Sequence, residues 1–242
     1  MTEDLDAPAR NAALALAEAM AAFLARALGA RLLGVYVMGS LAHGGFSRRY
    51  SDIDMAVLAE DGLGADEMAA VREHAAAHSP DLASKLSLFW ADRGFSVGRF
   101  PPLDRVDLID HAVALRERER VRPARPPRED VRAYLRGTPF SSWREGAARF
   151  AELQTLTPKD HKPFIRAHLY AARFVYSWMT GGMNSNDEAV AFTVAAAPVG
   201  LDLGLLEAAL ACRGAARDPD ALFPARHKLP AQVAACARFL DQ

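Results

Sequence analysis

Two aspartates, two positions apart, are the residues whose types and spacing most clearly suggest chemistry. Asp52 and Asp54 lead into the apolar run 55–58, which predicts a strand. Side chains on a strand alternate between its faces, so both carboxylates should share one face, with Ile53 on the other. Adjacent carboxylates raise the cost of ionising each other, and a divalent cation relieves that repulsion. The pair therefore predicts a Mg²⁺ site, because Mg²⁺ takes oxygen ligands and keeps partners from a substrate phosphate.

A glycine and a serine stand upstream of this pair, at the end of the apolar run 32–38. Gly39 allows close backbone approach and Ser40 offers a hydroxyl, which together suit a phosphate. A lone Asp-x-Asp has a plainer explanation, a solvated strand entrance with Ser51-Asp52 as turn chemistry. The ordered pattern of strand, Gly-Ser, short loop and Ser-Asp-x-Asp favours the phosphate and metal interpretation.

Residues 38–54 as a whole resemble the nucleotidyltransferase superfamily that includes DNA polymerase β and the aminoglycoside adenylyltransferases. The resemblance implies that Asp52 and Asp54 hold Mg²⁺ and that a nucleotidyl group, with ATP the expected donor, passes to an acceptor hydroxyl. It also implies a set of nucleotide-binding residues, namely Gly39, Ser40, Ser51 and Arg49. His43 is interpreted as a plain loop residue.

The second half carries a resemblance of its own. Residues 171–181, followed by 185–189, resemble the C-terminal helical domain of the streptomycin/spectinomycin adenylyltransferases. In that family a lysine in the capping segment reaches the nucleotide phosphates. This chain has Asn186 at the matching position, so the resemblance does not carry that contact over. The purely structural interpretation is a helix end followed by a capping box.

The third carboxylate expected in active members of the superfamily is missing from the next strand. Ser87 stands at the acidic position, and a serine is no general base at neutral pH. Asp92 is the nearest acid and is predicted as the third catalytic residue, acting from the strand end or loop. Two alternatives stay open: an acceptor that needs no strong base, or nucleotide binding without transfer. Further acids, at 104, 107 and 110, are interpreted as first-turn and surface helix residues.

The elements that would position these residues follow from periodicity and breakers. Strands are predicted at 31–38, 53–59, 85–91 and 112–116, and helices at 7–29, 65–78, 103–111, 201–213 and 228–241. A further helix is predicted to start at Thr157-Pro158 and to run to Thr180, and a capping box at 185–188 opens another. The predicted fold class is α+β: a small mixed sheet with flanking helices (1–122), then an α-helical bundle (123–242), joined through the proline-rich segment 117–128.

Composition limits the partners. The chain has 242 residues, of which 51% are hydrophobic, and a net charge of −1, which argues against a protein that binds long nucleic acids through counterion release. Cys212 and Cys236 are isolated thiols, the N-terminus is acidic, and no unbroken run of about 18 apolar residues is present. We therefore expect a cytoplasmic protein without a membrane partner.

These observations predict a Mg-dependent nucleotidyltransferase whose partners are a nucleoside triphosphate and an unidentified acceptor, a small molecule being favoured. The alternative is a catalytically weak or inactive protein of the same fold that binds a nucleotide or a protein partner, as antitoxin-like members of the superfamily do. Ser87 is the residue that keeps the alternative open.

Overall fold

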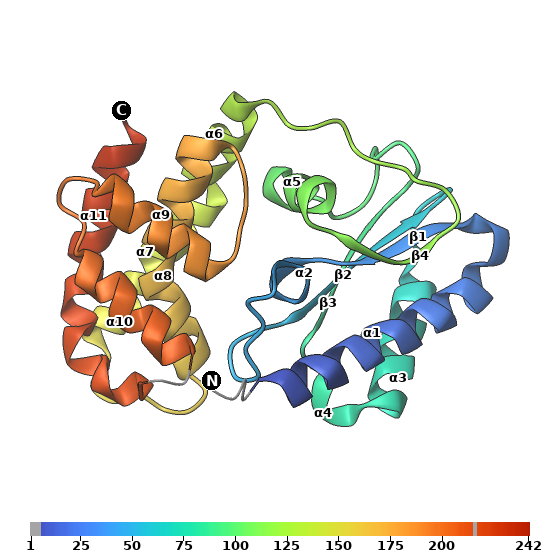
Figure 1. Ribbon diagram of the computed structural model, residues 1–242, viewed down its shortest axis with the longest axis horizontal. Helices are drawn as coiled ribbons and strands as arrows, with labels where there is room; N and C mark the ends of the chain where they lie inside the picture. Colours follow the sequence, from blue (N-terminus) through green and yellow to red (C-terminus); the bar gives the residue numbers. More distant parts are fainter. Residues whose placement is uncertain (1–5, 215–216) are drawn as a thin grey trace. The chain divides into compact units, whose positions relative to one another are not determined.

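The computed structural model of the chain describes residues 6–214 and 217–242. The chain divides into two compact units, Met1–Arg125 (unit 1) and Pro126–Gln242 (unit 2), drawn in Figure 1. The division falls inside the proline-rich segment, just after the predicted boundary between residues 122 and 123.

Unit 1 is built around a four-stranded mixed sheet with the strand order β3-β2-β1-β4. β1 pairs antiparallel with β2 and with β4, whereas β2 and β3 run parallel. The predicted α+β class with a small mixed sheet is confirmed. The elements of this unit are α1 (Ala7–Leu28), β1 (Leu32–Val37), α2 (Gly39–His43), β2 (Ile53–Ala59), α3 (Ala65–His78), α4 (Pro80–Ala83), β3 (Leu86–Ala91), α5 (Pro102–Asp110) and β4 (Val113–Glu117).

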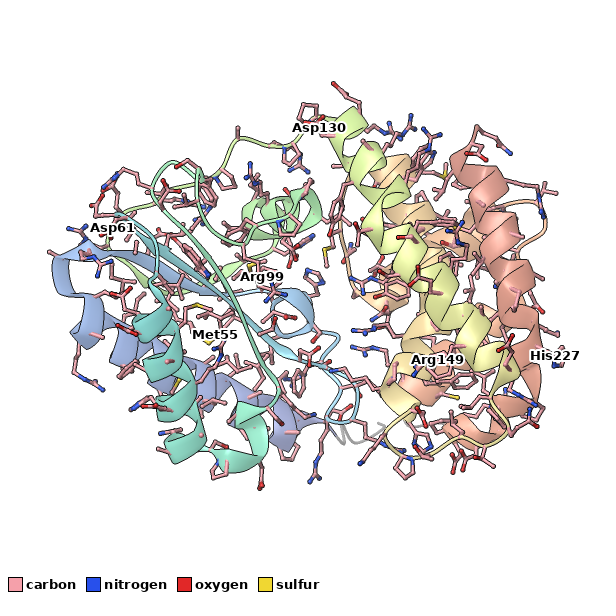
Figure 2. All side chains as sticks on the ribbon, turned by 180° about the vertical axis from the view of Figure 1, so that it is seen from behind. Met55, Asp61, Arg99, Asp130, Arg149 and His227 are labelled. Atoms are coloured by element: carbon pink, nitrogen blue, oxygen red, sulfur yellow. The ribbon has the colours of Figure 1, made fainter. Side chains whose placement is uncertain are left out.

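Helices cover the two faces of the sheet unequally. α1 and α3 lie on one face and α5 on the other (Figure 1). Side chains of β2 alternate accordingly: Ile53 and Met55 are fully buried with α1, whereas Ala56 packs with α5 residues such as Leu108. Met55 is labelled in Figure 2. By this alternation Asp54 belongs to the α5 face of the sheet.

The first helix is long and apolar enough to cross a membrane by length and composition, counting the 25 residues Ala7–Arg31. The expectation from the sequence concerned an unbroken apolar run, which Glu18 interrupts; the mean hydropathy of the segment nevertheless stays high enough to meet this criterion. In unit 1 the helix packs as a core helix against the sheet. Its buried residues are Ala13, Leu16, Ala17, Met20, Ala21, Leu24 and Leu28.

Unit 2 is helical throughout the part that the structure describes, as predicted. Its helices are α6 (Arg128–Arg136), α7 (Thr138–Glu152), α8 (His161–Thr180), α9 (Asn186–Ala196), α10 (Leu203–Arg213) and α11 (Leu229–Leu240), with 3₁₀ turns at Pro219–Ala221 and Phe223–Lys228. α8 is the central helix, and every other helix of the unit packs against it. The ring of Trp143 stacks on that of Phe174 at 5.3 Å, and its indole N–H donates to the carbonyl of Ala167 at 2.7 Å.

One predicted helix start in unit 2 is wrong. α8 begins at His161, not at Thr157-Pro158, because the carboxylate of Asp160 accepts hydrogen bonds from the backbone N and the hydroxyl of Thr157, the latter at 2.5 Å. A local side-chain turn thus competes with the helix for these groups. The predicted end at Thr180 is right, since Gly181 adopts the left-handed conformation with φ of 69°.

A histidine without polar partners lies in the core of unit 2. His168 of α8 is fully buried against the ring of Phe164, and neither of its ring nitrogens has a hydrogen-bond partner among the described residues. Burial lowers the pKa of His168 to about 4 from its ordinary 6.5, because the interior disfavours the charged form.

We expect unit 2 to lose stability as pH falls from about 6.5 to about 4. In that window the unfolded chain binds a proton at this imidazole that the folded chain rejects, so the free energy of unfolding decreases by about 3 kcal/mol in total. The His168→Leu variant should be less sensitive to pH over this range in urea denaturation at pH 7 and pH 4.5. His227→Leu, at an exposed histidine labelled in Figure 2, should keep the wild-type dependence. Equal pH dependence in the His168→Leu variant and the wild type would contradict the assignment.

Candidate functional site

One end of the sheet in unit 1 gathers the predicted site residues. β1 ends there, and β2, β3 and β4 begin there, since β1 is antiparallel to β2 and β4 while β3 is parallel to β2. The backbone N of Met38 donates to the carbonyl of Asp54 at 2.9 Å, which continues the β1–β2 ladder. The topology therefore brings the Gly39-Ser40 segment against the first residues of β2.

Gly39 packs closely against the side chain of Asp54. Gly39 has a φ of 58°, and a Cβ atom placed on it would lie 2.4 Å from Oδ2 of Asp54. Two features therefore favour glycine at this position. The backbone is left-handed, and the Asp54 carboxylate occupies the space that a side chain would fill. The segment after it is the short helix α2, where the sequence predicted only a loop.

Asp52 lies directly before β2, and Ser87 of β3 is the register partner of Asp54. In parallel strands register partners share a face, so Ser87 stands beside Asp54, where the third carboxylate was expected. Asp52 and Ser87 line an open pocket of about 410 Å³ next to the β3 edge. Three basic side chains line it too, those of Arg72, Lys85 and Arg99; Figure 2 labels Arg99.

Two other predicted nucleotide contacts lie in the segment before β2. The hydroxyl of Ser51 is buried and accepts a hydrogen bond from the backbone N of Ser47 at 2.9 Å, so it closes the loop. Arg49 is exposed, with its guanidinium 5.6 Å from the ring centre of Tyr50. The structure thus gives Ser51 a local structural role and leaves Arg49 on the surface.

Asp92, which the sequence predicts as the third carboxylate, does not lie beside the aspartate pair. It follows the last residue of β3, and the five residue steps from Ser87 correspond to about 16 Å along a strand. Its carboxylate instead caps a turn, accepting from the hydroxyl of Ser96 at 2.6 Å and from the backbone N of Val97 at 3.0 Å. These bonds, that of the Ser96 hydroxyl foremost, lower the pKa of Asp92.

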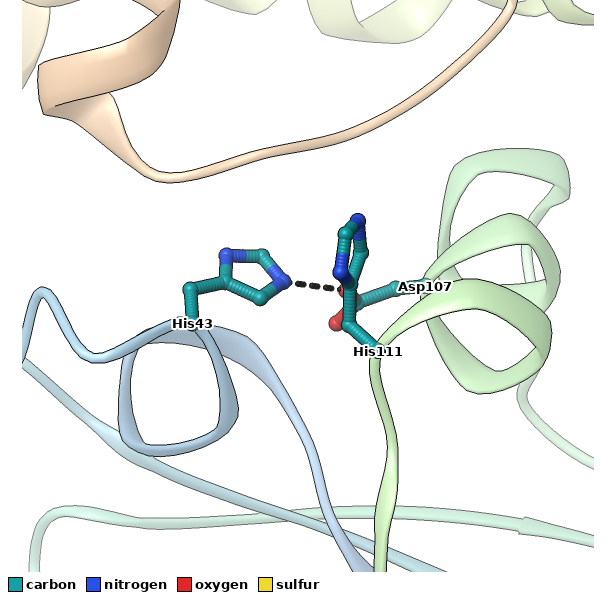
Figure 3. Close-up of side chains that lie close together, drawn as sticks. All are labelled: His43, Asp107 and His111. Atoms are coloured by element: carbon teal, nitrogen blue, oxygen red, sulfur yellow. Dashed lines mark hydrogen bonds and ion pairs between the residues drawn. The ribbon is translucent and has the colours of Figure 1, made fainter.

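A second polar cluster, which the sequence did not predict, adjoins Gly39. The carboxylate of Asp107 in α5 accepts from the backbone N of Gly39 at 2.9 Å and contacts Nε2 of His43 at 2.5 Å (Figure 3). The side chains of His43 and Asp107 are only 3% and 2% exposed, so the interpretation of Asp107 as a surface residue is wrong. His111 completes the cluster, its ring 4.6 Å from that of His43. The four-residue spacing of Asp107 and His111 was the available signal, because it places both on one side of a helix.

In unit 2, the segment that resembles the family's phosphate-contacting region forms helix ends. The hydroxyl of Ser185 accepts from the backbone N of Glu188 at 3.1 Å, and Asn186 is the first residue of α9. The backbone N of Ser185 donates to Asn184 and not to Glu188, so the reciprocal half of the predicted capping box is replaced. The structure accounts for this motif by helix capping.

No protein-family model matches the chain. No curated protein matches it either. Among solved structures, it is similar to spectinomycin adenyltransferase AAD(9) from Enterococcus faecialis, solved with ATP and spectinomycin, with a TM-score of 0.66 over 97% of this chain and 99% of that one, at 12% identity. The chain therefore shares its overall fold with that adenyltransferase. A toxin-antitoxin structure with AMP-PNP also matches, over 55% of this chain and 91% of that one, at 23% identity and a TM-score of 0.32.

Proposed function

We propose that this nucleotidyltransferase fold is a Mg-dependent enzyme that transfers an adenylyl group from ATP to a hydroxyl of a small molecule. The observation that carries the proposal is the packing of Asp54 against Gly39, with Asp52 two residues away and basic side chains around the adjoining pocket. The fold likeness to an adenyltransferase solved with ATP and spectinomycin supports ATP as donor and a compound of the aminoglycoside or aminocyclitol class as acceptor.

The donor set suits Mg²⁺. Asp52 and Asp54 supply carboxylate oxygens, and Ser87 adds a hydroxyl beside them, so the ligands are oxygens as Mg²⁺ prefers. When bound, the ion would neutralise charge on the attacking and leaving oxygens. The two aspartates would hold it, while Ser40 would donate its hydroxyl to a phosphate.

The protein would also have to position the acceptor and the triphosphate for the reaction. An acceptor hydroxyl attacks the α-phosphorus in line and pyrophosphate leaves, so phosphoryl-type catalysis needs alignment and charge stabilisation more than covalent help. Arg72, Lys85 and Arg99 line the pocket shared by Asp52 and Ser87, and they would attract the triphosphate and stabilise its charge. We further propose the cytoplasm as the compartment, which suits the free thiols of Cys212 and Cys236.

The second candidate function is nucleotide binding without transfer. It is favoured by one specific observation: Ser87 stands beside Asp54 where an acid would act, while Asp92 lies at the other end of β3. Positioning and metal electrostatics would then serve only to bind the nucleotide. The two functions share the same ATP site and differ in whether the α-phosphoryl group leaves it.

The test is transfer from ATP labelled at the α-phosphate to a panel of aminoglycosides and aminocyclitols, with Mg²⁺ or with EDTA. We expect a labelled acceptor and pyrophosphate only with Mg²⁺. The Ser87→Asp variant should transfer on the order of 10² times faster, since general-base help is typically worth at least that much. Ser84→Asp, which adds an acid to the same pocket off the strand, is the matched control. ATP binding without labelled product in either protein would favour the second candidate, and absence of ATP binding would refute both.

A further inference from the structure

The cluster of His43, Asp107 and His111 stands apart from the aspartate pair and has its own chemistry. One candidate ligand atom from each residue lies within 4.8 Å of the other two (Figure 3). The residues come from two elements of unit 1: His43 ends α2, Asp107 lies in α5, and His111 follows α5 directly. Two imidazoles and one carboxylate are a ligand set that borderline transition metals prefer, whereas Mg²⁺ prefers oxygen ligands.

We propose that His43, Asp107 and His111 form a binding site for a transition-metal ion of the Zn²⁺ class, distinct from the Mg²⁺ site proposed at Asp52 and Asp54. In a tetrahedral Zn²⁺ site with bonds of about 2.0–2.2 Å, ligand atoms stand about 3.3 Å apart. The ligand atoms of His43 and Asp107 lie 2.5 Å apart, and all three ligand atoms lie within 4.8 Å of one another. Their separations would have to change by about 1–1.5 Å to reach the tetrahedral spacing.

Hydrogen bonds orient the carboxylate of Asp107, as residues around the direct ligands do in metal sites. One oxygen of Asp107 faces His43, while the other accepts from the backbone N of Gly39 at 2.9 Å. The ion would bind the first oxygen and leave the second anchored, so the ligand keeps its direction. Asp107 and His43 are buried, which strengthens the attraction between the carboxylate and a cation.

Three protein ligands leave a fourth position for water or a substrate group. Asp107 accepts a hydrogen bond from Gly39, and Gly39 packs against Asp54. Gly39 would therefore connect the bound ion to the proposed phosphate site. Loading it would hold α2 and α5 together at Gly39. We expect Zn²⁺ to raise the thermal midpoint of the nucleotide-free protein.

The experiment titrates the full-length, metal-free protein with Zn²⁺ against a chromophoric chelator, without nucleotide. The expected result is one equivalent bound. His43→Gln and His111→Gln should each weaken the affinity at least tenfold, the lower bound seen even for outer-shell changes. His74→Gln, in a histidine pair on α3, is the control for adventitious binding and should bind as wild type does.

Two further measurements keep the metal site separate from the proposed function. Co²⁺ should give the d–d absorption of a four-coordinate ion, lost in His111→Gln. The Asp52→Asn/Asp54→Asn variant should bind Zn²⁺ as wild type does, whatever becomes of its ATP binding. The proposal is overturned by absence of stoichiometric binding, by unchanged affinity in both cluster variants, or by loss of Zn²⁺ binding in the aspartate variant.

Discussion

Replacing Asp52 and Asp54 together by asparagine is expected to abolish Mg-dependent ATP binding and to reduce nucleotidyl transfer by at least about 10³-fold. Metal-ion charge stabilisation is worth several kcal/mol in the transition state, and each 1.36 kcal/mol is a factor of ten in rate. Asparagine keeps the size of each side chain and removes the charge that holds the cation. Isothermal titration with ATP, with and without Mg²⁺, measures binding, and the labelled-ATP assay measures transfer.

The double variant should fold as well as the wild type, because asparagine keeps the size of each side chain and the sequence places the two carboxylates on one face, where they would repel each other without metal. Circular dichroism and the thermal midpoint check this. The matched control is Asp92→Asn, which alters an aspartate of the same domain at the other end of β3. Its amide oxygen can still accept from the turn that Asp92 caps, so binding and transfer should match the wild type. Mg-dependent ATP binding that survives in the double variant would place the metal elsewhere.

Local patterns in the sequence were enough to predict most of unit 1. The helix expected at 65–78 and the strand expected at 53–59 have those bounds, because alternation and breakers are short-range signals. Alternation also predicted correctly that Ile53 turns away from the face of Asp54, since Ile53 is fully buried with α1. The position of Gly39-Ser40 directly after a strand was predicted for the same reason, although the short helix α2 that they open was not.

What the sequence could not provide is contact between distant segments. Asp107 and Gly39 are 68 residues apart and meet only because α5 packs on the sheet beside the end of β1. A helical spacing places Asp107 on a face without saying what that face meets, so it was interpreted as solvated. The distance of Asp92 from the pair depends on β3 staying regular up to Ala91, whereas the prediction assumed that the strand end or loop could bring Asp92 back.

The contact of Gly39 with Asp54 predicts a second large mutational effect, at Gly39. Gly39→Ala should lower both the stability of unit 1 and its affinity for Mg-ATP. The residue has a φ of 58°, a conformation that costs an L-residue about 1–2 kcal/mol. The new methyl group would also lie 2.4 Å from Oδ2 of Asp54, with no room to relax except by moving the carboxylate. Overpacking of this kind costs about 1–3 kcal/mol more.

Gly44 provides a matched control on the same short segment. Its φ is 82°, but a Cβ built there meets nothing within 4 Å, so Gly44→Ala has the backbone cost without the collision. In urea denaturation, Gly39→Ala should therefore be destabilised more than Gly44→Ala. In titrations with Mg-ATP, only Gly39→Ala should lose affinity, because only that methyl group displaces a proposed metal ligand. Equal losses of stability in the two variants would show that the backbone conformation alone, and not the collision with Asp54, causes the destabilisation. Wild-type affinity in Gly39→Ala would show that the Asp54 carboxylate is not where the nucleotide and its ion bind.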